Sequence, residues 1–262
     1  MVAWLRVALR DNDVYANMEP GFSGKVISHL QKYVIGEEVT FEDRTDQDIL
    51  WYLTGSEIQS GLGMSGLDIF SWQPWQHADL HWGNIPIAMQ RCDFLGHRGF
   101  FLWTPAEHRH SLDAKWKEHY PLHSVSDPLW NRLRVEALTP AFGIDLDETM
   151  LPQEANRTEQ AISFTKGCYL GQETVARIRA YGHVNRQLKR LRLAGNSNEP
   201  GRWTGALLKA GDKEVGRLKT VAWFPEPGCM RAIGLVRKEY LIAGTELKAV
   251  DSESKETTAL IE

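Results

Sequence analysis

Cysteine is scarce in this sequence. Only three of the 262 residues are cysteines, Cys92, Cys168 and Cys229, and they are far apart in the chain. No Cys-x-x-Cys pair occurs, so neither a disulfide framework nor a thiolate zinc site is indicated. Three dispersed thiols are typical of a protein in a reducing compartment, and we expect a cytoplasmic location.

Long apolar runs and a strong charge of either sign are absent as well. No stretch approaches the roughly 18 apolar residues that a membrane-spanning helix needs, and the first ten residues lack the features of a signal peptide. With 30 Lys and Arg against 34 Asp and Glu, the formal charge is −4. This balance provides no general attraction for nucleic acid or acidic membranes, so no membrane partner is expected and there is no strong signal for nucleic acid. Local basic stretches could still bind a small anion.

The composition is that of an ordinary globular protein, with 42% hydrophobic and 24% charged residues. Strand signals occur at 2–9, 14–18, 39–42, 49–53, 85–92 and 99–103. Helix signals occur at 21–34, 107–120, 128–138 and 174–181. Residues 61–83 are expected to be irregular. This order predicts an α+β fold rather than a parallel doubly wound sheet.

The character of the chain changes near residue 186. Short strand signals follow at 187–193, 206–209, 214–223, 231–236 and 246–250, with glycine and proline between them. Such spacing is typical of a small antiparallel barrel or sandwich. We therefore predict an α+β region over residues 1–185 and a C-terminal β-barrel over residues 186–262.

Two motifs carry little weight. Residues 61–66 match the dinucleotide pattern G-x-G-x-x-G, but no strand precedes them and no helix follows, so a flexible turn is the better interpretation. His77 and His81 are four residues apart, as in some zinc sites, but no third ligand has suggestive spacing. Surface or packing roles are expected for both histidines, and no metal site is predicted.

Residues 164–187 are the most informative stretch. Cys168 precedes a helix that is expected to begin near Gly171, where free N–H groups and the helix dipole favour a thiolate. Lys166 adds positive charge two residues away. Arg177, Arg179 and Arg186 follow and could contact an anion. The alternative is a buried structural cysteine beside a solvated basic helix face.

These residues resemble a known family. The octapeptide Lys-Gly-Cys-Tyr-Leu-Gly-Gln-Glu at 166–173 continues to Arg177, Gly182-His183 and Asn185-Arg186. It is similar to the signature of the YgfZ family of folate-binding proteins, which are relatives of the glycine cleavage T-protein, an aminomethyltransferase. A second block is similar to a segment that this family shares with T-proteins: it contains Arg134-Val135-Glu136-Ala137, Pro140, Phe142-Gly143, Asp145 and Leu151-Pro152-Gln153-Glu154.

The resemblance implies a fold and a cofactor. It implies folate-binding modules of T-protein and YgfZ type, followed by the small barrel, with tetrahydrofolate as the ligand. By motif, Glu136 corresponds to the carboxylate that recognises the pterin, because a carboxylate accepts hydrogen bonds from ring N–H and amino groups. An ion pair with Arg132 or Arg134 is the alternative. Trp130 corresponds to a folate-contacting tryptophan, with core packing as its alternative.

The same resemblance suggests a function. Lys166 and Arg177 are the further predicted cofactor contacts, and Cys168 corresponds to a signature cysteine linked to the maintenance of iron–sulfur enzymes. We therefore expect a tetrahydrofolate-binding protein that supports assembly, repair or maintenance of iron–sulfur enzymes through Cys168. Those enzymes or their assembly machinery would be its partners. The alternative is a folate-dependent aminomethyl or one-carbon transferase that resembles the T-protein.

Two departures from the family pattern bear on this expectation. Family members begin with a further strand-rich segment, so part of the family's N-terminal portion is expected to be missing here, with consequences for folate affinity. T-proteins also place an aspartate near the start of the helix expected at 21–34, where this chain has Ser23, Gly24 and Lys25. A carboxylate can stabilise a cation or move a proton. Its absence predicts no glycine-cleavage aminomethyl transfer.

Overall fold

The structure is a computed structural model of the whole chain, and it describes all residues except 56–57, 59–67, 70, 120–121 and 196–197. The glycine pattern at 61–66 therefore lies outside the described residues. The chain forms two compact units, Val2–Val125 and Ser126–Glu262, and Met1 belongs to the second. No helix in the described part of the chain is long and apolar enough to cross a membrane.

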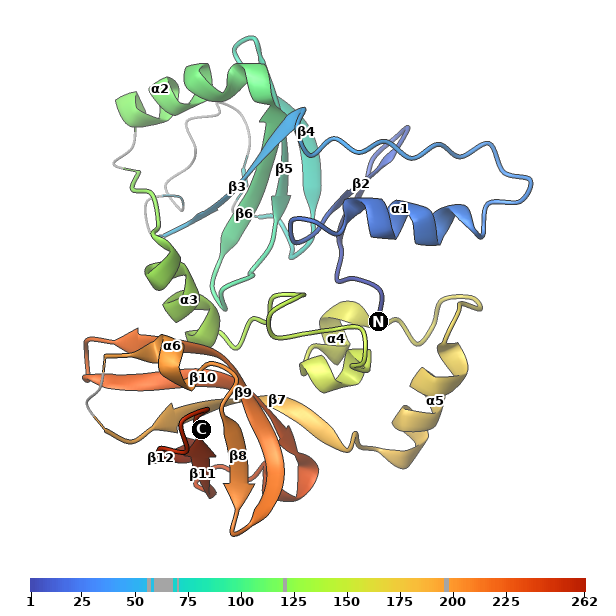
Figure 1. Cartoon of the computed structure of the whole chain (residues 1–262). Helices are drawn as coiled ribbons and strands as arrows, with labels where there is room; N and C mark the ends of the chain where they lie inside the picture. The colour runs from blue at the N-terminus through green and yellow to red at the C-terminus, as the bar shows by residue number, and fades with distance from the viewer. Residues whose placement is uncertain (56–57, 59–67, 70, 120–121, 196–197) are drawn as a thin grey trace. The chain divides into compact units, whose positions relative to one another are not determined.

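A four-stranded antiparallel sheet is the centre of the unit Val2–Val125. Its strand order is β3 (Asp48–Thr54), β6 (Gly99–Pro105), β5 (Ile85–Arg91) and β4 (His77–Trp82) (Figure 1). Side chains alternate between the two faces of each strand. On one face, Met89 and Leu102 pack with Leu112 of helix α2 (Arg109–His119). On the other face, the ring of Trp103 stacks on Tyr15, with centroids 4.6 Å apart.

Tyr15 belongs to a two-stranded ribbon that precedes the sheet in the chain. Strands β1 (Arg6–Leu9) and β2 (Val14–Asn17) pair in antiparallel register, with the polar residues 11–13 between them. Helix α1 (Ser23–Gln31) follows. Both strands and the helix were expected from the sequence, because each has a clear periodic pattern and a turn signal at its end.

Two predictions for this unit are wrong. Residues 39–42 do not form a strand; Val39 is 51% exposed, and a short apolar–polar alternation without a pairing partner does not form a ladder. Conversely, β4 occupies His77–Trp82 within a stretch expected to be irregular. Its pairing with β5 decides its structure, since Ala78, Leu80 and Trp82 contact the sheet core.

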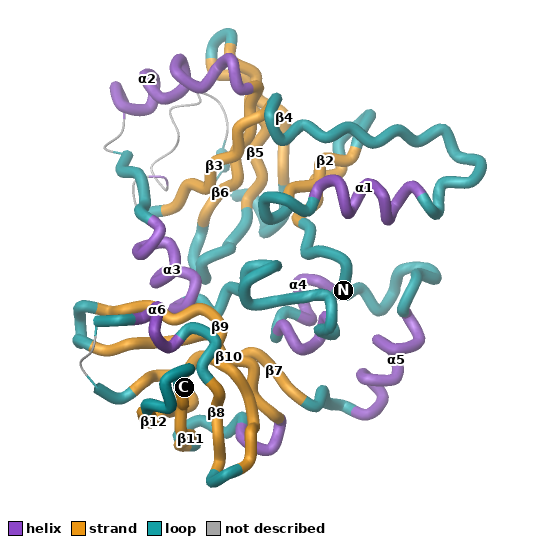
Figure 2. Tube along the Cα trace, viewed as in Figure 1, coloured by secondary structure: helices purple, strands orange, loops and turns teal. Residues whose placement is uncertain are grey.

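A closed six-stranded antiparallel barrel dominates the second unit. Its strands run in the order β10 (Cys229–Arg237), β7 (Arg186–Leu193), β12 (Glu256–Ile261), β11 (Glu246–Val250), β8 (Leu207–Ala210) and β9 (Lys213–Phe224) (Figure 2). Alternate side chains fill the interior, among them Leu191, Leu208 and Leu218. The predicted antiparallel barrel is thus confirmed. The strand β12 and the short helix α6 (Pro200–Trp203) were not predicted.

A close approach between strands explains one glycine of the barrel. A Cβ atom built on Gly216 would lie 2.3 Å from the backbone oxygen of Leu235, on the neighbouring strand β10. No side chain fits at that distance, so glycine is required where these two strands meet.

Helical elements precede the barrel in the same unit. They are α3 (Asp127–Glu136), the 3-10 turn η3 (Pro152–Ala155), α4 (Thr158–Ala161) and α5 (Gln172–Tyr181). The domain boundary near residue 186 stays a prediction: the first barrel strand begins at Arg186, whereas the compact unit that contains the barrel begins at Ser126.

Candidate functional site

All predicted site residues lie in the unit Ser126–Glu262, in two areas. Trp130 and Glu136 are on α3, whereas Lys166, Cys168 and Arg177 are on α5 or the loop before it. In the described part of the chain, no hydrogen bond or ion pair joins Glu136 to Lys166 or Arg177. The structure therefore presents an α3 area and an α5 area.

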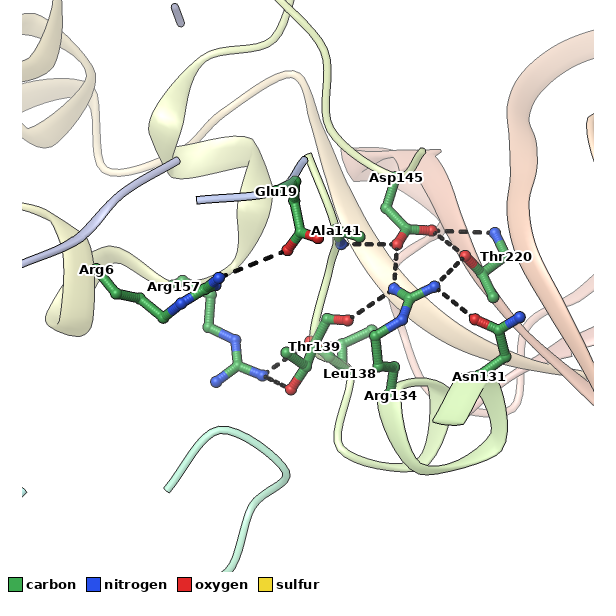
Figure 3. A network of polar contacts seen from close by, with 10 residues as sticks. All are labelled: Arg6, Glu19, Asn131, Arg134, Leu138, Thr139, Ala141, Asp145, Arg157 and Thr220. Atoms are coloured by element: carbon green, nitrogen blue, oxygen red, sulfur yellow. Dashed lines mark hydrogen bonds and ion pairs between the residues drawn. The ribbon is translucent and has the colours of Figure 1, made fainter. Parts of the chain in front are cut away.

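A buried ion pair anchors the α3 area to the barrel. The side chains of Arg134 and Asp145 are 2% and 0% exposed, and Arg134 Nη1 lies 2.6 Å from Asp145 Oδ2. Arg134 also donates to Asn131, and Asp145 accepts from both the backbone N–H and the hydroxyl of Thr220 (Figure 3). Because Thr220 lies on β9, this network holds α3, and with it Glu136, in a set position on the barrel.

Glu136 is fixed by two arginines of the barrel. Arg190 Nη1 lies 3.3 Å from Oε1 of Glu136 and also donates to its backbone oxygen at 2.7 Å, and Arg231 donates to Oε2. The carboxylate is 51% exposed. The pairing with arginines was foreseen as an alternative, but the partners come from β7 and β10 instead of α3. Each carboxylate oxygen has a second lone pair, so acceptor capacity for a ligand remains.

Trp130 is half-buried in the first half of α3. It precedes Glu136 by six residues, which places the two side chains about 120° apart around the helix axis. The two residues thus share a helix but not a face. A ligand that touched both would have to extend around α3.

A second arginine–carboxylate pair within the family-like blocks is part of the fold. Arg186 Nε donates to Glu154 Oε1 at 2.7 Å, and Glu154 also accepts from the backbone of Leu151. Glu154 is 5% exposed. This pair joins η3 to the first barrel strand, so Arg186, which was expected to be available for an anion, is committed to a buried carboxylate.

The α5 area is a surface feature. Gly171 adopts a left-handed conformation with φ 88° directly before α5, and Gly182, with φ 74°, ends the helix as predicted. Lys166 and Cys168 are exposed on the preceding loop. The Lys166 ammonium lies 4.5 Å from the centroid of the Tyr169 ring, and Arg177 pairs with Glu173 at 2.9 Å on the exposed face of α5.

We predict that Cys168 reacts with a thiol reagent faster than the other two cysteines. Cys168 is exposed, Cys229 is partly buried and Cys92 is 1% exposed in the sheet core, so access to the thiol differs most between Cys168 and Cys92. Timed labelling of the native protein, read by peptide mass, measures the order. Labelling in urea controls for differences unrelated to folding. If Cys168 were labelled last in the native protein, the prediction would be wrong.

A carboxylate that sequence reasoning missed lies beside the start of α1, in the other compact unit. The first turn of α1 has no acidic residue, as expected. The Asp43 side chain, however, hydrogen-bonds with Ser23 and accepts from the backbone and hydroxyl of Thr45. These bonds, that from Ser23 first, hold the pKa of the Asp43 carboxyl below its ordinary value. No sequence pattern links residues twenty positions apart across a loop.

Metal ligands do not gather in the described residues: no group of three or more His, Cys, Asp or Glu is placed to hold an ion. His77, one of the two histidines considered for zinc, contacts the backbone oxygen of Leu9 through Nε2 at 2.5 Å. His77 is therefore engaged in a polar contact within the sheet unit.

Comparison with known proteins shows relatives and a fold. The chain is 30% identical over 174 residues to the tRNA-modifying protein YgfZ of Yersinia pseudotuberculosis, covering 66% of this chain and 49% of that protein. It is 27% identical over 236 residues to a chloroplastic protein of Arabidopsis thaliana whose name marks it as a proposed transferase, covering 87% and 52%. No protein-family model matches. The chain spans about half the length of these relatives.

A solved structure has the same fold. The glycine cleavage system aminomethyltransferase T from Bartonella henselae matches with a TM-score of 0.77 and 20% identity, over 95% of this chain and 66% of that chain. The α+β region and the C-terminal barrel therefore define the class of protein: this chain has the T-protein fold. Within that class its sequence is similar to YgfZ proteins, as the signature at 166–173 predicted.

Proposed function

We propose that the chain binds tetrahydrofolate and supports the assembly, repair or maintenance of iron–sulfur enzymes, with Cys168 as its functional group. The observation that carries the proposal is the exposure of the signature. Lys166, Cys168 and Glu173 are all at the surface, so this specific sequence is not explained by packing. A distinctive surface loop on a rigid support is more often functional than structural. The iron–sulfur enzymes or their assembly machinery would contact this loop.

The folate part of the proposal rests on Glu136 and the relationship to the T-protein fold. Glu136 is held by Arg190 and Arg231 and is half exposed, so its orientation is set while part of the carboxylate faces solvent. Such a group can accept hydrogen bonds from a pterin without the entropy cost of ordering a free side chain. Trp130 would offer a flat face, and Lys166 or Arg177 a charge for the acidic tail.

Glu136→Ala is expected to weaken tetrahydrofolate binding while the protein stays folded. Pterin donors left without an acceptor cost about 1–3 kcal/mol per group, which corresponds to roughly 5- to 150-fold in affinity. Calorimetric titration measures the change, and Glu159→Ala, an exposed carboxylate on α4, is the matched control. Equal affinity of a folded Glu136→Ala protein and the parent would remove Glu136 from the site.

The second candidate is a folate-dependent aminomethyl or one-carbon transferase. It is favoured by the fold of aminomethyltransferase T and by the name of the Arabidopsis relative. The structural feature that could serve it is Asp43 beside Ser23. The cytoplasmic location expected from the cysteines stays a prediction, since that relative is chloroplastic by name.

A further inference from the structure

A hollow of about 380 Å³ lies between α5 and the loop before it, and the proposed function leaves it without a role. The loop contributes Ser163, Phe164 and Tyr169, and α5 contributes Gln172, Arg179 and the buried Val175. The volume is within the range of small-ligand sites. All of these residues belong to the unit Ser126–Glu262.

Two cations lie over aromatic rings that line this hollow. The Arg179 guanidinium is 4.2 Å from the centroid of the Phe164 ring, and the Lys166 ammonium is 4.5 Å from that of Tyr169. Stacking uses the face of the guanidinium and leaves its in-plane N–H donors available. Neither Arg179 nor Lys166 pairs with a carboxylate in the described part of the chain, whereas the neighbouring Arg177 does.

We infer that this hollow binds a nucleotide, with the base against the aromatic side chains and the phosphate between Arg179 and Lys166. The charge argument favours an anion, because Arg179 lines the hollow, Lys166 lies over the lining ring of Tyr169, and neither cation pairs with a carboxylate in the described part of the chain. The shape argument requires a flat ring, since Phe164 and Tyr169 both line the space. A nucleoside monophosphate combines the two, either free or as part of a nucleic-acid strand. This inference goes beyond the proposed function, and it assigns Lys166, one of the two cations offered there for the acidic tail of folate, to the phosphate of a nucleotide.

The net charge of −4 is compatible with such a site. A negatively charged protein does not attract long nucleic acid in general, but a local pair of cations can bind one phosphate. Ser163, whose hydroxyl accepts from the backbone N–H of Lys166 at 3.2 Å, fixes the loop that carries both Lys166 and Phe164. The site is therefore partly organised before a ligand arrives.

The test is calorimetric titration of the whole chain with AMP, adenosine and inorganic phosphate. AMP is expected to bind at least about tenfold more tightly than either part alone, because only AMP uses both the rings and the cations. Arg179→Gln and Lys166→Gln should each weaken AMP binding about tenfold. Lys213→Gln, an exposed lysine at the start of β9, is the charge control and should bind AMP as the parent does.

Titration with a trinucleotide of adenylate shows whether the hollow binds a free nucleotide or part of a nucleic-acid strand. Tighter binding of the trinucleotide than of AMP assigns the hollow to a nucleic-acid strand, and equal or weaker binding assigns it to a free nucleotide. Absence of AMP binding at millimolar concentration overturns the inference, as does undiminished binding by Arg179→Gln. Displacement of AMP by p-aminobenzoylglutamate at lower concentration would instead make the hollow part of the folate site and also overturn it.

Discussion

Arg134→Ala is expected to lower the free energy of unfolding of the barrel unit by about 3–5 kcal/mol, because it leaves a buried carboxylate without its cation. Asp145 is fully buried, and after the substitution only the donors of Ala141 and Thr220 would remain. The loss would also free the end of α3 and thus alter the position of Glu136. Urea unfolding followed by circular dichroism measures the effect.

A surface ion pair provides the matched control for this experiment. Arg177 and Glu173 are four residues apart on α5, at 2.9 Å, and their side chains are 64% and 87% exposed. Such pairs contribute about 0.3–0.5 kcal/mol, so Arg177→Ala should barely change the unfolding curve. A similar small change for Arg134→Ala would mean that the buried network contributes little to stability.

The second large effect concerns catalysis: we expect no glycine-cleavage aminomethyl transfer, even with tetrahydrofolate bound. The first turn of α1 lacks a carboxylate. Asp43 lies next to Ser23, but it is exposed on a loop, and water screens an exposed charge that a catalytic site would keep dry. Loss of a positioned acid–base group costs about 10²–10⁴ in rate, so turnover should be near background.

The assay mixes the protein with aminomethylated lipoyl carrier and tetrahydrofolate and follows ammonia and methylene-tetrahydrofolate. Robust turnover would make the transferase the better function. Asp43→Asn would then show whether Asp43 replaces the T-protein aspartate, since the amide keeps the size of the side chain but cannot become charged.

A comparison of variants in cells tests the iron–sulfur function directly. Under the iron–sulfur proposal, Cys168→Ala should lower the activity of iron–sulfur enzymes in cells, because the exposed thiol is the proposed functional group. Cys229→Ala, which changes a partly buried thiol on β10, is the control. Full iron–sulfur enzyme activity with Cys168→Ala would argue against the thiol as the working group.

Local pattern predicted most of the elements and failed where pairing decides the structure. The helices at α1, α3 and α5 were predictable because apolar spacing and a terminal signal such as Gly182 act within a few residues. The predictions for β4 and for residues 39–42 were both wrong. Their sequences are similarly mixed, and only β4 has a neighbouring strand with which to form hydrogen bonds.

The sequence by itself determined the family relationship, the α+β class with its barrel and the signature around Cys168, since motifs and periodicity are local in the chain. Tertiary structure alone decided which charges are buried. Arg134 and Arg186 look like surface arginines in the sequence, yet each pairs with a buried carboxylate. In the described part of the chain, Arg179, which lines a hollow, and Lys166 have no carboxylate partner. The partners of these side chains are set by contacts between distant segments, and no spacing in the sequence encodes them.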